Sequence, residues 1–158
     1  FQALVKLGLL PFGEIRSMDE THPSLTANSI GRHISDYVRT KVVSKLSPWM
    51  SACSLGEVYM TPVSHGEGRF IANDALCQKL FSRHQIASQY VDETDFPTHD
   101  MPHNPNGSVH AIEAISSPCG RILGRMGHSE RKGTHVGTNI PGNKEQPIFE
   151  SGVRYFTD

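Results

Sequence analysis

A histidine and a glutamate stand two residues apart in the stretch RMGHSER, directly after an apolar run that predicts a strand. The carboxylate of Glu130 could accept the imidazole N–H of His128, which would fix the tautomer and leave the other ring nitrogen free as a base. This is the logic of a nucleophile–histidine–acid triad. The alternative is a solvated surface turn, because most such pairs have no catalytic role.

A second polar segment, VSHGEGRF, follows another expected strand. Ser64 and His65 precede two glycines, Gly66 and Gly68, which flank Glu67. Glycine permits tight backbone geometry, so backbone N–H and C=O groups here could face a small polar ligand. The alternative is a hairpin turn that uses glycine for its backbone angles alone.

The nine histidines raise the question of a metal site. His99, Asp100 and His103 lie together in PTHDMPHN, and a metal-dependent hydrolase built on them is one possible interpretation. Prolines break this segment, so no helical face can aim the two rings jointly. We therefore expect a solvated loop here and no metal ligand in the chain.

The three cysteines, Cys53, Cys77 and Cys119, form no CxxC pair. A disulfide framework or a structural zinc site is therefore not expected, and a reducing cytoplasm is the default location. None of them follows a strand in the sharp strand–turn–helix elbow that exposes a nucleophile. Each is expected to be a buried and inert thiol.

The hydrophobic pattern along the chain alternates between strand and helix periods, which indicates one domain of the mixed α/β class. Turn residues separate the segments, notably NPNGS at 104–108. Nothing in front of Phe1 caps the first helix, so we expect the chain to be part of something longer. The expected helices are 1–7, 47–53, 73–81 and 146–156, and the expected strands are 25–30, 33–44, 57–63 and 86–91, with a hairpin of 109–116 and 121–126.

The charge balance and the hydropathy pattern argue against two classes of partner. The 158 residues carry a formal charge of -1 with a pI of about 6.8, so no basic excess exists to neutralise nucleic-acid phosphates. No apolar run approaches the roughly 20 residues of a membrane span. We expect neither nucleic acid nor a membrane as partner.

Taken together, several segments resemble the glutaminase domain of the phosphoribosylformylglycinamidine synthase family, which belongs to the class I glutamine amidotransferases. The resemblance covers nearly the whole chain in the family's order. Its most specific motifs are SHGEGR, NPNGS and MGHSER, and it extends from FQALVKLGLLP through TANSIGRH, RTKVVSKLSPWM, IASQYVD and NIPG to PIFESGVRYF.

The resemblance implies a flavodoxin-like α/β domain with a Cys–His–Glu triad, in which His128 and Glu130 match the base and the acid. In the family the nucleophilic cysteine lies in a Gly-x-Cys-x-Gly elbow immediately before Phe-Gln. Residues 1–158 would then form a partial glutaminase domain, without the N-terminal strands and the elbow. Ser129 stands where the wider class commonly has proline, which changes the rigidity of the turn but neither catalytic group.

Four further residues match the family's substrate pocket. Gln2 matches a glutamine of the elbow helix, and Ser64, His65 and Gly66 match the segment that lines the glutamine site. The resemblance implies that the parent protein hydrolyses glutamine and passes ammonia to a synthetase region of the same polypeptide. There ATP and Mg²⁺ would activate formylglycinamide ribonucleotide for amidine formation in purine biosynthesis, and these residues would hold no cofactor of their own.

The isolated chain is expected to be inactive, because the nucleophile would be missing, and to be marginally stable, because missing strands would leave an apolar edge exposed. The alternative hypothesis is a non-catalytic docking module with a degenerate amidotransferase fold. Retention of both His128 and Glu130 argues mildly against it, since a dead domain has no chemical need for that pair.

Overall fold

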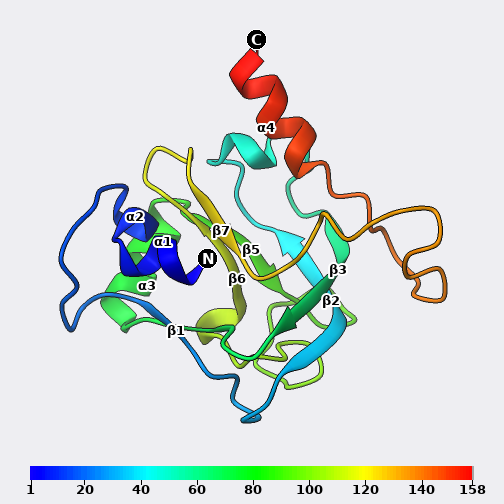
Figure 1. The fold of residues 1–158 in the computed structure, drawn as a ribbon, viewed down its shortest axis with the longest axis horizontal. Helices are drawn as coiled ribbons and strands as arrows, with labels where there is room; N and C mark the ends of the chain where they lie inside the picture. The colour runs from blue at the N-terminus through cyan, green and yellow to red at the C-terminus, as the bar shows by residue number, and fades with distance from the viewer. Residues whose placement is uncertain (158) are drawn as a thin grey trace.

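A five-stranded sheet forms the centre of the computed structural model, which describes residues 1–157 (Figure 1). Every neighbouring pair in this sheet is antiparallel, and the spatial order is β3-β2-β5-β6-β7. A separate two-stranded sheet pairs β1 with β4. The strands are β1 (Ser24–Thr26), β2 (Ile34–Val42), β3 (Val58–His65), β4 (Arg69–Ile71), β5 (Ile86–Tyr90), β6 (Ile112–Ser116) and β7 (Leu123–Arg125).

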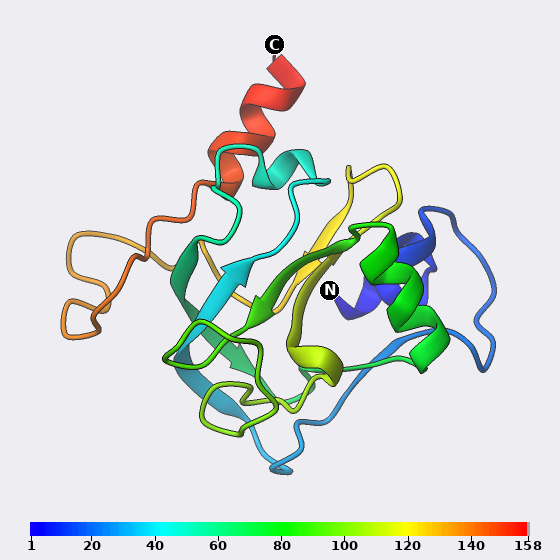
Figure 2. The ribbon, with the colours of Figure 1, turned by 180° about the vertical axis from the view of Figure 1, so that it is seen from behind.

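Most of the helices lie in two groups beside the sheet, as both views show (Figures 1 and 2). The helices α1, α2 and α3 gather beside β6 and β7, and the C-terminal helix α4 packs against the 3-10 helix η1 at one end of the molecule. The short 3-10 helix η2 belongs to neither group and contacts β4 and β5. The helices are α1 (Gln2–Lys6), α2 (Leu9–Phe12), η1 (Pro48–Met50), α3 (Asp74–Ser82), η2 (Val109–Ala111) and α4 (Ile148–Thr157).

Buried apolar side chains fill the space between the sheet and each group of helices. Successive residues of a strand point to opposite faces, so Ile86 joins the core under α1, α2 and α3, whereas Ala87 joins the core under η1 and α4. The first core contains Val5, Leu10, Leu25, Phe70, Leu80, Ile86, Ile112, Ile115 and Met126, and the second contains Val42, Met50, Cys53, Tyr59, Ala87, Ala114 and Ile148.

Most of the expected elements are present, and local chemistry explains them. The expected helix 73–81 corresponds to α3, where the side chain of Asn73 accepts a hydrogen bond of 2.8 Å from the Leu76 N–H as an N-cap. The expected strands 33–44, 57–63 and 86–91 correspond to β2, β3 and β5, and the expected hairpin contains the antiparallel pair β6 and β7.

Three expectations of length were wrong. The strand expected at 25–30 ends at Thr26, because the backbone and side chain of Asn28 bond to the loop after β3 instead of to a neighbouring strand. The helix expected at 47–53 is only the 3-10 turn η1, and the hairpin begins at Ile112 because η2 precedes it.

The mixed α/β class is confirmed. A flavodoxin-like domain is built on parallel strands, and the strands within residues 1–157 contribute only antiparallel pairs.

In α4, Ile148 is buried, whereas Phe149, Val153 and Phe156, expected on the same face, are 54 to 62% exposed. None of the helices within residues 1–157 is long and apolar enough to cross a bilayer.

Candidate functional site

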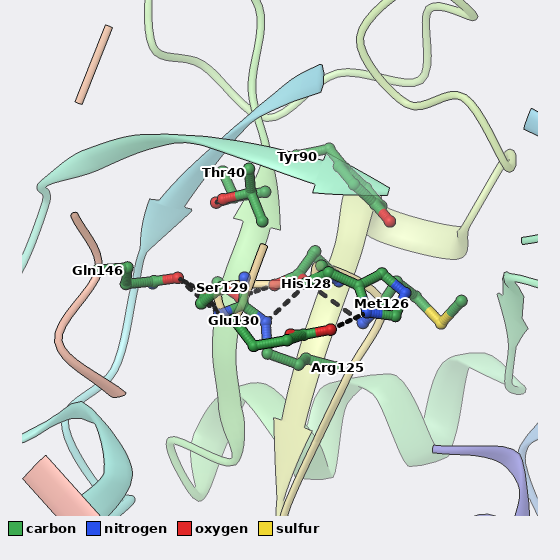
Figure 3. Close-up of polar contacts among 12 residues, drawn as sticks. Thr40, Tyr90, Arg125, Met126, His128, Ser129, Glu130 and Gln146 are labelled. Atoms are coloured by element: carbon green, nitrogen blue, oxygen red, sulfur yellow. Dashed lines mark hydrogen bonds and ion pairs between the residues drawn. The ribbon is translucent and has the colours of Figure 1, made fainter. Parts of the chain in front are cut away.

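The chain leaves β7 and crosses to β3, and this crossing places His128. A β-bridge joins Gly127 to Val63 of β3, and the His128 N–H donates to the carbonyl oxygen of Pro62 at 2.8 Å. The imidazole Nδ1 then lies 2.6 Å from Oε1 of Glu130 (Figure 3). The two side chains therefore face one another, as the spacing in the sequence predicts.

The pair is open to solvent on one side. The His128 side chain is 32% exposed and that of Glu130 is 52% exposed. Partial burial acts to raise the pKa of Glu130, but its own backbone N–H and the His128 ring outweigh this and lower the pKa overall. Glu130 is therefore a carboxylate at neutral pH. Within residues 1–157, Nε2 of His128 has no hydrogen-bond partner, so this nitrogen is available as a base.

A buried carboxylate lies directly behind this turn. Glu113 on β6 is 0% exposed, and its Oε1 accepts from the backbone N–H groups of Gly127 at 2.7 Å and Met126 at 3.2 Å. The same oxygen accepts from Nε of Arg125 at 3.2 Å, and the Ser88 hydroxyl donates to the other oxygen. Glu113 therefore connects β5, β6 and β7 at the two residues that immediately precede His128 in the chain.

The guanidinium of Arg125 extends this network beyond the histidine. Its Nη1 donates to Oγ of Ser129 at 2.7 Å and to Oε1 of Gln146 at 2.5 Å, and the Ser129 hydroxyl donates to the same Gln146 oxygen at 2.8 Å. Figure 3 shows Ser129 and Gln146 on the side of the turn away from the imidazole. Sequence reasoning treated Ser129 as neutral and missed Glu113, Arg125 and Gln146.

The segment after β3 forms a tight turn around Asn28. The Asn28 side chain donates to the His65 carbonyl at 2.7 Å and accepts from Gly68 N–H at 3.1 Å, and its backbone N–H donates to the Gly66 carbonyl at 2.9 Å. Gly68 is required here, since a Cβ at this position would lie 2.3 Å from the His65 ring. A Cβ at Gly66, in contrast, would lie more than 4 Å from the surrounding described atoms.

The two polar side chains of this segment are held by other partners. His65 Nδ1 lies 3.1 Å from Oδ1 of Asn28, and Nε2 is buried and has no hydrogen-bond partner in the described part of the chain. Burial first, and then the neighbouring charge of His33, lower the pKa of His65, so its ring is neutral at pH 7. Ser64 Oγ lies 3.4 Å from the His33 ring.

The first helix and the residue before it, Phe1, adjoin both the turn after β3 and strand β7. Nε2 of Gln2 donates to Oε2 of Glu67 and to the carbonyl of Leu25, each at 3.3 Å. The Phe1 ring packs against Gly124 of β7, so closely that a Cβ there would lie 2.5 Å from it. The structure thus brings α1, the turn after β3 and the turn after β7 to one region, although they are far apart in the sequence.

A cavity of about 380 Å³ opens beside Glu130 on the face that carries η1 and α4. Its walls are mostly apolar, and the charged side chains among them are Arg121, Arg125 and Glu130. The lining residues are Trp49, Arg121, Ile122, Leu123, Arg125, Gly127, Ser129, Glu130, Ile148 and Phe149. A larger cavity of about 460 Å³ between α2 and α3 contains none of the candidate residues.

The other chemical candidates do not join this site. The described residues contain no group of three or more His, Cys, Asp or Glu side chains that could hold a metal ion. The ring of His99 instead lies near another histidine ring, that of His110, with 6.5 Å between the two ring centroids. Cys53 and Cys77 are buried, and burial raises the pKa of both thiols.

The expectation of burial was wrong for Cys119. This residue is exposed at the tip of the β6–β7 hairpin, where hydrogen bonds from Ser117 and then from the Arg121 N–H lower the pKa of its thiol. A hairpin tip points into solvent, and the apolar character of cysteine does not reverse that.

Comparisons with known proteins agree with this geometry. The phosphoribosylformylglycinamidine synthase subunit PurQ of Synechococcus sp. (strain JA-2-3B'a(2-13)) is 34% identical over 156 residues, which cover 99% of this chain and 59% of that protein. The PurQ subunit of Methanosarcina acetivorans is 32% identical over 135 residues, or 85% and 56% of the two chains. These relatives are named as subunits, whereas the resemblance described above implies a synthetase region in the same polypeptide.

A solved structure gives the same relationship in three dimensions. The structure of PurLQS from Thermotoga maritima matches 99% of this chain and 58% of the compared chain, with a TM-score of 0.68 and 26% identity. The chain thus spans less than two thirds of the length of the relatives it matches. The family model of the CobB/CobQ-like glutamine amidotransferase domain matches residues 1–156. The chain therefore belongs to the CobB/CobQ-like glutamine amidotransferase family.

Proposed function

We propose that this chain supplies the base and the acid of a glutaminase whose cysteine nucleophile lies in the complete protein outside these 158 residues. The observation that carries the proposal is the 2.6 Å contact between His128 Nδ1 and Glu130 Oε1, with Nε2 free. Membership in the amidotransferase family supports glutamine as the substrate. No cysteine within residues 1–157 hydrogen-bonds to His128, which supports a thiol from elsewhere.

The chemistry follows from these groups. Nε2 of His128 takes the thiol proton, and the thiolate attacks the side-chain amide carbon of glutamine. The imidazolium then donates this proton to the departing ammonia, which leaves a glutamyl thioester. Water, deprotonated by the same nitrogen, hydrolyses the thioester to glutamate and the free thiol. The Glu130 carboxylate holds the ring in one tautomer and stabilises its cationic form.

The pocket for glutamine is proposed to lie between the turn after β3 and the first helix. Ser64, His65 and Gly66 would contribute mostly backbone groups, because their side chains are either absent or engaged with Asn28 and His33. Gln2 would close the pocket from α1, where its contact with Glu67 already points it toward this turn.

The ammonia released here is proposed to serve the conversion of formylglycinamide ribonucleotide to its amidine in purine biosynthesis, in the cytoplasm. The partner would be a synthetase, either in the same polypeptide or as a separate subunit; the second arrangement is supported by the relatives' name, phosphoribosylformylglycinamidine synthase subunit PurQ. ATP and Mg²⁺ would bind in the synthetase, outside these residues. Supporting this, the relatives carry the name of that synthase.

The test replaces His128 by alanine in the complete protein and compares two nitrogen sources. Glutamine-dependent amidine formation should fall by roughly 10³-fold or more, whereas the rate with ammonium chloride should not change. Glu130→Gln should lower the glutamine-dependent rate by on the order of 10²- to 10⁴-fold, since the ring loses its charged partner. A glutamine-dependent rate within tenfold of the original in His128→Ala would refute the proposal.

A further inference from the structure

We infer that Glu113, Arg125, Ser129 and Gln146 form a positioning network that fixes the turn carrying His128. The inference rests on the proposed glutaminase function and deepens it. None of the four touches the reacting atoms in this proposal. They act on the histidine through the backbone on either side of it.

The residue before His128 is held by the buried carboxylate. Oε1 of Glu113 accepts the Gly127 N–H at 2.7 Å, and this short bond to a charged acceptor is stronger than an ordinary backbone hydrogen bond. The ion pair also packs directly on this backbone, since a Cβ at Gly127 would lie 2.6 Å from Nη2 of Arg125 and 3.0 Å from Glu113. No free space remains into which Gly127 could move on this side.

The residue after His128 is held by the same ion pair from the other end. Ser129 is 6% exposed, and its hydroxyl both accepts from Arg125 Nη1 and donates to Gln146 Oε1. Serine leaves the backbone angle φ free, unlike proline, so these side-chain bonds must supply the rigidity of the turn. His128 therefore stands between two anchored neighbours, and its ring is directed at Glu130 (Figure 3).

The network leaves one feature that permits a sharp test. Gln146 uses only its carbonyl oxygen, which accepts both bonds, while its amide nitrogen is buried without a partner among residues 1–157. A carboxylate at this position keeps the accepting oxygen, whereas a leucine of similar size does not. Gln146→Glu and Gln146→Leu are thus matched variants, the first conservative for this role and the second not.

The experiment measures glutamine hydrolysis and the imidazole signal of the complete protein. Gln146→Leu and Ser129→Ala should each lower kcat by roughly tenfold, because misplacement of the base by a fraction of an ångström slows proton transfer, with KM within about twofold. Gln146→Glu should stay within about threefold of the original kcat. The ammonium-dependent rate should be unchanged in all three.

A spectroscopic readout separates positioning from general stability. In ¹⁵N-histidine-labelled protein, the short Nδ1–H bond to Glu130 should give a downfield proton signal that weakens in Ser129→Ala and Gln146→Leu and returns in Gln146→Glu. Unchanged kcat and signal in Ser129→Ala, or equal kcat for the two Gln146 variants if Ser129→Ala does not fold, would overturn the inference. Full activity in His128→Ala would instead overturn the proposed function, so the two failures are distinguishable.

Discussion

Gly127→Ala tests the placement of the turn that carries His128 with a single methyl group. The new Cβ would lie 2.3 Å from Cγ2 of Thr61, a short side chain in the buried part of β3, and 2.6 Å from Arg125. Ordinary van der Waals contact begins near 3.4 Å, so the backbone must retreat by about 1 Å. This retreat stretches the 2.8 Å bond from His128 N–H to the Pro62 carbonyl.

A displacement of this size has two separable consequences. Overpacking should lower the free energy of unfolding by about 1–3 kcal/mol, and a 1 Å shift of the base should lower kcat for glutamine hydrolysis on the order of 100-fold. Both are measured on the complete protein, by thermal unfolding and by release of glutamate. Ammonium-dependent synthesis should be unaffected.

Gly152→Ala provides the matched control. A Cβ at Gly152 would lie 2.2 Å from the Trp49 ring, so the packing of α4 on η1 should suffer a comparable clash that involves Trp49 and not the strands β3 and β7 beside His128. We expect a similar loss of stability, with kcat within about threefold. A Gly127→Ala protein that hydrolyses glutamine at the original rate would refute this account of how the turn is positioned.

Three further outcomes are expected. Glu113→Gln should lower the free energy of unfolding by about 3–5 kcal/mol, because it leaves the Arg125 guanidinium without its buried countercharge. Chemical denaturation measures this loss for Glu113→Gln and for the double variant Glu113→Gln with Arg125→Met. An equal loss of stability in the two variants would contradict the pairing. Stability should fall as the pH drops below about 6.5, where the unfolded chain binds a proton at His65 that the folded chain, with its lowered pKa, does not yet bind. A His65→Gln variant should show a flatter dependence of stability on pH. An unchanged slope would contradict the lowered pKa of His65. Cys119, exposed and with a lowered pKa, should react with iodoacetamide at neutral pH at least tenfold faster than the buried Cys77, and comparable rates would contradict the placement of the hairpin tip.

Local sequence signals were sufficient for the elements whose stability is local. The Asn73 cap and the amphipathic pattern after it predicted α3, and β-branched residues predicted β2. The His128–Glu130 contact was predictable because only two residues separate the groups.

The supporting network was not predictable, because its members meet only after folding. Glu113 stands in an otherwise apolar strand, and nothing in the pattern AIEAIS shows whether its side chain is paired and buried or exposed. Its partner Arg125 is 12 residues away, and Gln146 reaches Arg125 across 21 residues of the chain. Ser129 was considered only for its backbone, although its hydroxyl is the group that matters in the structure.

The central claim is that His128 deprotonates a catalytic thiol, and the reactivity of that thiol measures it most directly. Complete protein, original or His128→Ala, is treated with iodoacetamide at pH 7, and the alkylation rate of each cysteine is followed by mass spectrometry. The claim predicts that one cysteine outside these 158 residues reacts roughly tenfold or more slowly without the imidazole, while Cys119 reacts at an unchanged rate. Identical rates for every cysteine in the two proteins would contradict it.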